Sequence, residues 1–233
     1  MWRGKLLIIP QICTNRFLLM LKIESFIFGP FQENTYVLFD ETSEGVILDP
    51  GCYEQQEQLT LSQFISDNHI KIIQVINTHC HIDHVLGNQF VKNKYQAPLA
   101  IPEGEKEILA AVKIYAPNYG FPAYQEAEVD EYIKEQDTVE FGDTRFDVLL
   151  VPGHSPGHLA FYHDESKVCF GGDVLFQSSI GRTDLPGGDH QTLIRSIHEK
   201  IFSLPDEVIV YSGHGPPTTV GQEKKTNPFC AIV

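Results

Sequence analysis

The strongest constraint in this sequence is a run of potential metal ligands at the end of an apolar segment. The run reads Thr78-His79-Cys80-His81-Ile82-Asp83-His84. A β-branched strand pattern at 72–76 precedes it, and a helical pattern at 85–93 follows it. Alternate residues of a strand point to the same side, so the imidazoles of His79 and His81 at the strand end can face one space. Asp83 and His84 follow the bend and can reach the same space from another direction. The chain must therefore turn from a strand into a helix and gather four donors at that turn.

Similar donors recur at three later points where a strand pattern stops beside glycine. They are His154 after 144–151, Asp173 after 167–171 and His214 after 208–211. Glycine allows the backbone to turn sharply and to approach a ligand closely. A lone histidine at a strand end is more often a capping or core residue than a ligand. Repetition at three strand ends reverses that preference and predicts one shared metal site.

The number of donors predicts two metal ions. There are five imidazoles and two carboxylates in the set, whereas a catalytic zinc site uses about three protein ligands and keeps one position open. Two ions about 3.5–4 Å apart, bridged by a carboxylate and water, would use every donor. Asp173 is the expected bridge because it is the carboxylate outside the first run. A structural zinc site would usually include cysteine, and Cys80 points away from its neighbouring histidines along an extended strand.

Strand and helix patterns cover most of the remaining chain. Strands are expected at 21–28, 34–39, 45–48, 72–77, 98–101, 138–141, 144–151, 158–163, 167–171 and 208–211, and amphipathic helices at 54–68, 103–115 and 190–202. The strands occur in consecutive groups and do not alternate strictly with helices, which predicts mixed or antiparallel sheets covered by helices in a layered α/β fold. The segment 116–130, rich in proline, glycine and asparagine, is expected to be a loop bordering a binding cleft.

The amino-acid composition indicates which kinds of binding partner and which cellular compartment suit this chain. The chain has 233 residues, 42% of them hydrophobic, which suits one globular domain. Its formal net charge of −14 argues against binding to nucleic acid or to an anionic membrane, because both need a basic surface. Five cysteines without a C-x-x-C pair indicate reduced thiols and a cytoplasmic protein. No segment approaches the ~20 apolar residues that a membrane span needs.

The N-terminal segment differs in composition from the rest. Residues 1–19 contain three basic residues and no acid, so all 31 acidic residues lie after them. An apolar stretch near the start resembles a signal peptide, but Pro10 and Gln11 interrupt it. Met20 opens a strand pattern. We therefore expect an extension at 1–19 and a folded hydrolase domain at 20–233.

At this point the sequence resembles the metallo-β-lactamase fold superfamily over about residues 20–228. The resemblance rests on the order and strand-end positions of the seven donors described above. It implies a four-layer αββα sandwich of two mixed β-sheets flanked by helices, with the metals at the edge of the sheets. By position, it assigns His79, His81 and His154 to one metal, Asp83, His84 and His214 to the other, and Asp173 to both.

Within that superfamily, four further segments are similar to the short glyoxalase II-like hydrolases, which lack the C-terminal helical domain. These segments are 31–36, 48–51, 181–184 and 213–219. The resemblance implies a hydroxyacylglutathione hydrolase-like thioesterase that acts on a small thioester such as S-lactoylglutathione. The attacking hydroxide would form between two divalent ions, most simply zinc, although iron or manganese also suit these ligands. Asp83, His81 and Asp173 are the expected catalytic residues, with Asp83 orienting the nucleophile.

Substrate contacts are less constrained by the sequence. Arg182 suits a substrate carboxylate, but an ion pair with Asp184 would explain it equally well. Aromatic side chains of the loop region would wall the cleft or pack in the core; they are Tyr115, Tyr119, Phe121 and Tyr124. The remaining histidines are expected on the surface or around the ligands; they are His69, His158, His163, His190 and His198.

The same donor set is compatible with other functions. A persulfide dioxygenase shares the fold but holds one iron with two histidines and an aspartate, which leaves the other donors idle. A lactonase or a non-catalytic metal-binding module is also compatible with the donor set. A β-lactamase would need export, which the N-terminal segment does not favour. Metal content and a panel of thioester, lactone and persulfide substrates separate these alternatives.

Overall fold

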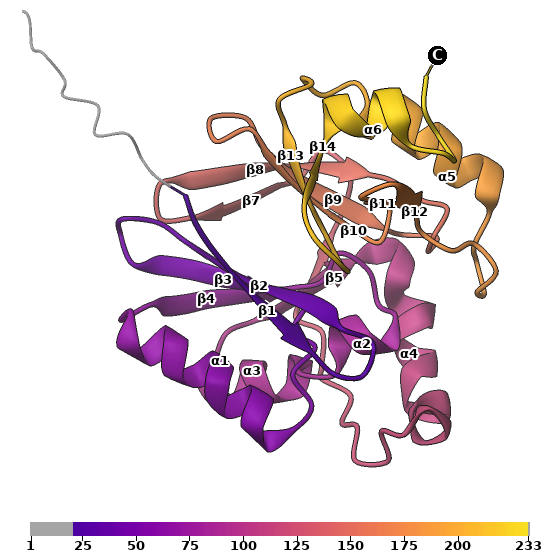
Figure 1. Cartoon of the computed structure of the whole chain (residues 1–233). Helices are drawn as coiled ribbons and strands as arrows, with labels where there is room; N and C mark the ends of the chain where they lie inside the picture. Colours follow the sequence, from indigo (N-terminus) through magenta and orange to yellow (C-terminus); the bar gives the residue numbers. More distant parts are fainter. Residues whose placement is uncertain (1–20, 233) are drawn as a thin grey trace, which may run out of the picture.

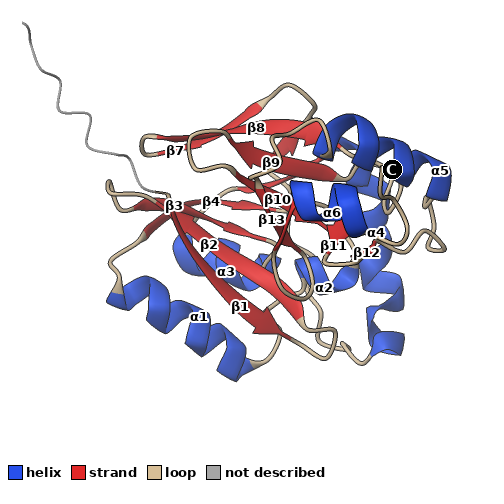
Figure 2. Cartoon of the chain, turned by 45° about the horizontal axis from the view of Figure 1, so that its top comes forward, coloured by secondary structure: helices blue, strands red, loops and turns tan. Residues whose placement is uncertain are grey.

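The computed structural model of this protein describes residues 21–232, so the predicted extension at 1–19 lies outside the described residues. Two six-stranded β-sheets pack face to face, and helices cover the outer side of each sheet. Figure 2 shows the strands enclosed between the two sets of helices. This is the four-layer αββα sandwich that the resemblance implied, and that prediction is confirmed.

The first sheet is mixed and follows the chain order. Its strands are β1 (Lys22–Phe28), β2 (Glu33–Phe39), β3 (Glu44–Leu48), β4 (Lys71–Ile76), β5 (Leu99–Pro102) and β6 (Glu131–Ile133). The pairs β1–β2 and β2–β3 are antiparallel, and β3 to β6 run parallel. Parallel strands need crossover connections, and helices supply all three of them, between β3 and β4, between β4 and β5, and between β5 and β6.

The second sheet is also mixed, with one parallel pair. In spatial order its strands are β14 (Thr218–Thr219), β13 (Ile209–Ser212), β10 (Val168–Gly172), β9 (Leu159–His163), β8 (Thr144–Leu150) and β7 (Thr138–Phe141). Only β10 and β13 run parallel. A small hairpin of β11 (Leu175–Phe176) and β12 (Ser179–Ile180) follows β10 directly.

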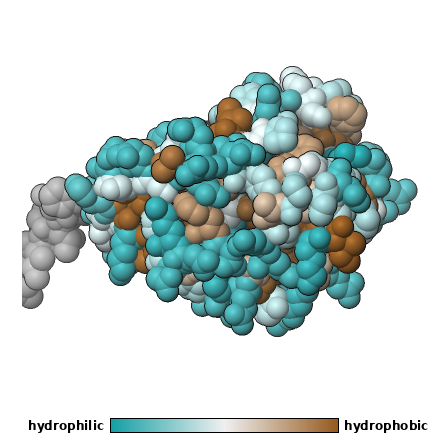
Figure 3. Space-filling model, turned by 90° about the horizontal axis from the view of Figure 1, so that it is seen from below, coloured by the Kyte–Doolittle hydropathy of each residue, from teal (hydrophilic) through white to brown (hydrophobic). Residues whose placement is uncertain are grey.

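Helices form the outer layers. The first sheet is covered by α1 (Gln55–Asp67), α2 (Ile82–Val85), α3 (Asn88–Tyr95) and α4 (Lys106–Tyr115), with short 3₁₀ turns η1 (Glu103–Glu105) and η2 (Ala116–Tyr119) at the two ends of α4. The second sheet is covered by α5 (His190–Ser196), its π-helical continuation η3 (Ile197–Ile201), and α6 (Val220–Thr226). Seen from below the view of Figure 1, the molecule is mostly hydrophilic (Figure 3), as expected for amphipathic helices that bury one face.

Three apolar clusters hold the layers together. Between the sheets lie large buried side chains from both, including Leu48, Phe146 and Phe170. A second cluster joins the first sheet to its helices, and a third joins the second sheet to α5 and η3. Full burial of each large apolar side chain contributes about 1.5–3 kcal/mol. Burial in these three clusters therefore stabilises the sandwich that carries the predicted ligands.

Most predicted elements are present with shifts of one or two residues at their ends. All ten predicted strands and the three amphipathic helices have counterparts, and 116–130 is a loop apart from η2. The sequence interpretation did not include β6, the β11–β12 hairpin, β14 or α6. No helix within residues 21–232 is both long enough and apolar enough to cross a membrane.

Candidate metal centre

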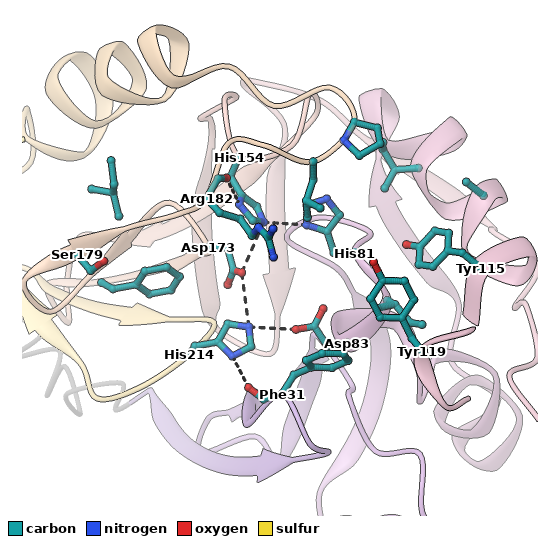
Figure 4. A pocket seen from close by; sticks show the side chains of 17 residues that line it. Phe31, His81, Asp83, Tyr115, Tyr119, His154, Asp173, Ser179, Arg182 and His214 are labelled. Atoms are coloured by element: carbon teal, nitrogen blue, oxygen red, sulfur yellow. Dashed lines mark hydrogen bonds and ion pairs between the residues drawn. The ribbon is translucent and has the colours of Figure 1, made fainter. Parts of the chain in front are cut away.

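The predicted ligands lie where strands of both sheets end at the same edge of the sandwich. His79 and His81 follow β4, and Asp83 and His84 lie in the short helix α2 that begins after the turn. The second sheet contributes one ligand after each of β8, β10 and β13; these are His154, Asp173 and His214. Figure 4 shows five of these side chains pointing into one space from both sheets. The structure thus brings all seven predicted ligands together.

Three histidines form the first cluster. In it, His81 Nδ1 lies 2.8 Å from His154 Nε2, and His79 Nε2 lies 3.2 Å from the same atom. One nitrogen from each of the three rings lies within 4.8 Å of the others. The opposite nitrogen of His154, Nδ1, is 2.8 Å from the backbone carbonyl of Arg182, which fixes the ring so that Nε2 faces the cluster.

Asp83, His84 and His214 form the second cluster. The Oδ2 atom of Asp83 lies 3.1 Å from His214 Nε2 and 3.9 Å from His84 Nε2. The other nitrogen of His214, Nδ1, is 3.0 Å from the backbone carbonyl of Phe31, so the loop between β1 and β2 orients this ring. The second cluster therefore depends on both sheets.

Asp173 lies between the two clusters. Its Oδ1 is 3.5 Å from His84 Nε2, and its Oδ2 is 3.5 Å from both His154 Nε2 and His214 Nε2. One carboxylate thus faces histidines of both clusters, which is the position that a bridging ligand requires.

The donor atoms in this centre fit two divalent cations. The nitrogens of the first cluster point at one another, an arrangement that satisfies each of them only if a proton or a cation lies between them. His84 Nε2 and Asp173 Oδ1 are buried and face each other at 3.5 Å, but neither forms a well-aligned hydrogen bond with any of residues 21–232. An unsatisfied buried polar group costs about 1–3 kcal/mol, and a cation within reach of both clusters would remove that cost.

The protonation states of the first cluster favour metal binding. Burial lowers the pKa of His79 far below its usual value, and burial together with the neighbouring His154 lowers the pKa of His81 to about 3. Both imidazoles are therefore neutral near pH 7. Burial alone would raise the pKa of Asp173, but His84 and the other facing histidines outweigh it and hold this pKa well below the usual range. Neutral imidazoles and an ionised carboxylate are the forms that bind metals.

In the second cluster, the pKa values of the histidines are raised instead of lowered. Burial lowers the pKa of His84, but the carboxylates of Asp173 and Asp83 outweigh it and raise this pKa well above its usual value. The pKa of His214 is raised for the same reason, with its hydrogen bond to Asp83 as the largest contribution that opposes burial. A cation entering the second cluster must therefore displace protons.

Asp49, to which sequence reasoning gave no role, holds the end of β4. It accepts hydrogen bonds from the backbone N and the Oγ1 of Thr78, at 2.7 and 2.6 Å, and its Oδ2 lies 3.1 Å from His84 Nδ1. Its backbone is in the left-handed region, with φ +51°. The signal available in the sequence was the segment Leu48-Asp49-Pro50-Gly51 at the end of β3, which entered only as part of a resemblance.

Glu105, which sequence reasoning also missed, connects two ligand loops. Its buried carboxylate accepts hydrogen bonds from the backbone N of Cys80 at 3.0 Å, from Ser155 Oγ at 2.6 Å and from the backbone N of Gly157 at 2.7 Å. Cys80 lies between His79 and His81, and Ser155 follows His154. The carboxylate therefore ties together the two segments that carry the first cluster. No sequence pattern marked this acid, because it reads as one charge at the start of a helix.

The remaining histidines were expected either on the surface or around the ligands, and His158 and His163 differ in this respect. His158 is buried, stacks on His79 with ring centroids 4.6 Å apart, and its Nε2 accepts a hydrogen bond from the backbone N of Asp173 at 3.0 Å. It therefore lies around the ligands, as expected. His163 is neither a surface residue nor a neighbour of the ligands, because it is buried and packs on Phe146.

A cavity of about 590 Å³ opens over the metal centre. Five predicted ligands, Arg182 and apolar side chains from α4 and the β11–β12 hairpin line it. Of the aromatic residues for which both positions were open, Tyr115 and Tyr119 line the cavity, whereas Phe121 is buried in the core and Tyr124 packs against it. Arg182 forms two 2.7 Å bonds to the carboxylate of Asp184, through Nε and Nη2. The ion pair with Asp184 is therefore present, and the substrate contact of Arg182 stays a prediction.

The fold and the paired clusters define a class of protein, an αββα sandwich with a histidine and aspartate metal centre at its edge. The family model described as the metallo-β-lactamase superfamily matches residues 28–214. This chain belongs to that superfamily and is one of its metallo-hydrolases.

Three relatives show how far the similarity extends. A Haemophilus influenzae protein named hydroxyacylglutathione hydrolase GloC is 36% identical over 201 residues, which are 85% of this chain and 93% of the relative. The crystal structure of the BLEG-1 B3 metallo-β-lactamase has a TM-score of 0.83 at 37% identity and covers 91% of this chain and 100% of its own. The di-iron-bound crystal structure of TTHA1623 has a TM-score of 0.78 at 35% identity and covers 88% and 99%, respectively.

Proposed function

We propose that this protein hydrolyses thioesters at a centre of two divalent metal ions, in the manner of a glyoxalase II-like hydroxyacylglutathione hydrolase. The observation that carries the proposal is the carboxylate of Asp173 placed 3.5 Å from histidines of both clusters, so that one residue can serve two ions. The name of the H. influenzae relative supports a thioester such as S-lactoylglutathione as the substrate.

Each cluster would hold one ion. His79, His81 and His154 would ligate the first, and Asp83, His84 and His214 the second, with Asp173 shared. These nitrogen and oxygen ligands suit zinc, iron or manganese, and we propose zinc as the resident metal. The di-iron form of TTHA1623 supports iron as the other candidate. When bound, such a pair supplies hydroxide at neutral pH, because it lowers the pKa of the water between the ions towards about 7.

Asp83 would orient the attacking water. Its carboxylate lines the cavity and lies 3.1 Å from His214 Nε2. Burial raises its pKa, but His84 and the hydrogen bond from His214 outweigh burial, and the net pKa lies below the usual value. The carboxylate is therefore ionised at neutral pH and can accept a hydrogen bond from a water held beside it. His81 and Asp173 also line the cavity, so the bound substrate carbonyl would lie next to both clusters.

The arrangement of both clusters favours the hydrolase over a persulfide dioxygenase. A single-iron dioxygenase would use two histidines and an aspartate, so His84 and His214 would not be metal ligands. In this chain both side chains face Asp173 within 3.5 Å. A fully assembled second cluster supports two ions.

Elemental analysis combined with a substrate panel tests the proposal. The protein purified from its own host should contain about two metal ions per chain and should hydrolyse thioesters such as S-lactoylglutathione. The panel also contains a lactone, a β-lactam and a glutathione persulfide, the last monitored by oxygen uptake. One iron per chain together with thiol-dependent oxygen uptake would select the dioxygenase. Two bound metals without turnover of any substrate would favour a non-catalytic binding module.

A further inference from the structure

We infer that the helix α6 supports one wall of the cavity, and that Glu223 and Asn227 of this helix are positioning residues for the substrate. The wall, here called the hairpin wall, consists of the cavity-lining residues of the β11–β12 hairpin, which are Phe176, Ser179 and Ile180. Neither Glu223 nor Asn227 is among the residues that line the cavity. The inference rests on the proposed function and adds two residues that act on substrate binding through this wall.

The β11–β12 hairpin is a small element that follows the shared ligand Asp173. Each of its strands has two residues, and a two-stranded hairpin alone is at best marginally stable in water. Its base is fixed, because Leu175 is buried and its backbone carbonyl accepts a hydrogen bond from Ser212 Oγ at 2.7 Å. Its tip, Gln177 and Ser178, is exposed. The position of the tip therefore needs a further support.

Glu223 holds the tip of the hairpin. Its carboxyl group is buried, and its Oε2 accepts a hydrogen bond from the backbone N of Ser178 at 3.0 Å. Ser178 has φ +57°, in the left-handed region that residues other than glycine rarely adopt. Such a conformation persists only where neighbouring contacts fix it. The bond from Ser178 to Glu223 is a contact of this kind, so the shape of the turn depends on α6.

Asn227, at the end of α6, makes a second contact with the hairpin. Its buried Nδ2 donates hydrogen bonds to the backbone carbonyl of Ser179 at 3.0 Å and to Glu223 Oε2 at 2.8 Å. Its Oδ1 accepts a hydrogen bond from the backbone N of Phe229 at 2.9 Å. Since Ser179 also lines the cavity (Figure 4), the bond to its carbonyl joins α6 directly to the wall.

The second sheet holds α6 in place independently of the hairpin. The backbone N of Val220 donates to the carbonyl of Val208 at 3.0 Å, and that of Gly221 donates to the carbonyl of Asp206 at 2.9 Å. Lys224 Nζ lies 2.7 Å from the carboxylate of Asp206. Val220 is buried in the apolar cluster of this sheet. Figures 1 and 2 show α6 beside the hairpin. The helix is thus a fixed support on which the hairpin rests.

Steady-state kinetics of metal-loaded variants with S-lactoylglutathione test the inference. Asn227→Asp keeps the size of the side chain, but a carboxyl group supplies at most one of the two donors, even when protonated. We expect KM to rise about five- to tenfold and kcat to change less than about twofold, because the wall contacts substrate and transition state alike. Gln222→Glu makes the same amide-to-carboxylate change at an exposed position of α6 and should change neither. An unchanged KM in Asn227→Asp would overturn the inference.

Substitutions at Glu223 separate positioning from stability. One of its oxygens faces the hydroxyl of Thr218 at 2.5 Å, and a hydroxyl can also accept, whereas both oxygens of Glu105 face backbone N–H groups. Glu223→Gln can therefore keep the bonds to Ser178 and Asn227, and it should have the wild-type KM. Glu223→Ala loses both bonds and should raise KM as Asn227→Asp does.

Thr218→Val is the control for stability, because it removes a buried hydrogen bond of Glu223 that does not reach the hairpin. This variant should have a lower Tm and an unchanged KM. An equal rise of KM in Thr218→Val and Glu223→Ala would show that KM follows stability, and would count against positioning. If Glu223→Ala does not fold, Asn227→Asp provides the comparison with Thr218→Val.

A double-mutant cycle tests whether α6 acts through the wall. Phe176→Ala removes the largest side chain of the hairpin wall and should by itself raise KM about tenfold. If Asn227 acts by placing this wall, the combination of Phe176→Ala with Asn227→Asp should raise KM no further than the stronger single change. Effects that multiply in the double variant would mean that the two residues act separately, which contradicts the inference.

Binding without turnover distinguishes this inference from the proposed function. The probe is S-benzylglutathione, a thioether that cannot be hydrolysed, and calorimetry measures its Kd with the metal-loaded protein. Asn227→Asp should raise this Kd by the same factor as KM. If the wild-type protein hydrolyses no thioester but the variant weakens probe binding, the proposed function fails and the positioning role stands. If the wild-type protein hydrolyses thioesters and the variant changes neither KM nor Kd, only the positioning role fails. A wild-type protein that neither hydrolyses thioesters nor binds the probe would contradict both.

Discussion

At the scale of single residues, Asp83 is the side chain whose loss should harm catalysis most selectively. It lies in α2 and faces the cavity, and its carboxylate contacts His214. We predict that Asp83→Ala lowers kcat at least about a hundredfold, because it removes both a ligand and the group that orients water. His81→Ala should have a similar effect. Kinetics are compared with those of Asp67→Ala, at the end of α1, and circular dichroism checks folding. Near-normal kcat in a metal-replete Asp83 variant would contradict the assignment.

The opposite pKa shifts of the two clusters predict an order of metal loading. His81, with its pKa lowered to about 3, is neutral across the usual pH range. His84 and His214 have raised pKa values, so protons compete with the metal for the second cluster, and the competition weakens as pH rises through those values. We predict that titration with zinc at about pH 6 gives one tight and one weak site, and that the weak site tightens at about pH 8. Calorimetry in two buffers should detect proton release at the weak site. Two equally pH-independent sites would be inconsistent with this prediction.

At the scale of secondary-structure elements, the turn η1 controls the first cluster through Glu105. A carboxylate buried between three donors cannot be replaced by an amide without placing an N–H against another N–H. Glu105→Gln should therefore release the loops of Cys80 and Ser155 and weaken metal binding in the first cluster at least about tenfold.

Cobalt substitution detects the change in metal binding of Glu105→Gln separately from any change in protein stability. The visible spectrum of the Co²⁺-loaded variant should change for one of the two ions and stay constant for the other. Glu103→Gln, on the same turn but exposed, is the matched control and should leave both spectra unchanged. An unchanged spectrum with only a lower melting temperature in Glu105→Gln would indicate a purely structural role.

The elements that sequence reasoning found and missed differ in how much apolar pattern they carry. Long strands such as β8 and amphipathic helices such as α4 were predictable because burial imposes a period on their residues. The helix α6 reads VGQEKKT and has little apolar pattern; the Thr219 side chain caps it by accepting a hydrogen bond from Gln222 N. Two-residue strands such as β11 are defined by pairing across the fold and leave no periodic signal.

At the scale of the whole molecule, the ligand cluster was predictable because the donors follow strand ends and the fold brings those ends to one edge. Its supports were not predictable, because Asp49 and Glu105 act through contacts between segments 25 or more residues apart in the chain. The same holds for the cavity, since α4 and the β11–β12 hairpin meet only in the folded sandwich. Sequence patterns thus predicted the metal ligands, whereas the residues that support the ligands and line the cavity are brought together only by the fold.

The metal centre should also contribute to the stability of the whole domain, because it joins the two sheets. Ligands that bind only the folded state stabilise it by about 4 kcal/mol at a thousandfold excess over Kd. For a domain of this size each kcal/mol shifts Tm by about 2–4 °C. We predict that removal of metal with a chelator lowers Tm by about 8 °C or more and that zinc restores it. Calorimetric scans of the apo and reloaded protein, with His190→Ala as an exposed-histidine control, make the comparison. Identical Tm values would argue against ions that bridge the sheets.

If this fold holds two ions around one shared carboxylate, both ions can be located in a crystal of the metal-loaded protein. Anomalous X-ray diffraction from crystals of the metal-loaded protein, collected on both sides of the metal absorption edge, measures this directly. Our account predicts two anomalous peaks about 3.5–4 Å apart, one among His79, His81 and His154 and one among Asp83, His84 and His214, with Asp173 touching both. A single peak, with His84 and His214 turned away from it, would contradict the account.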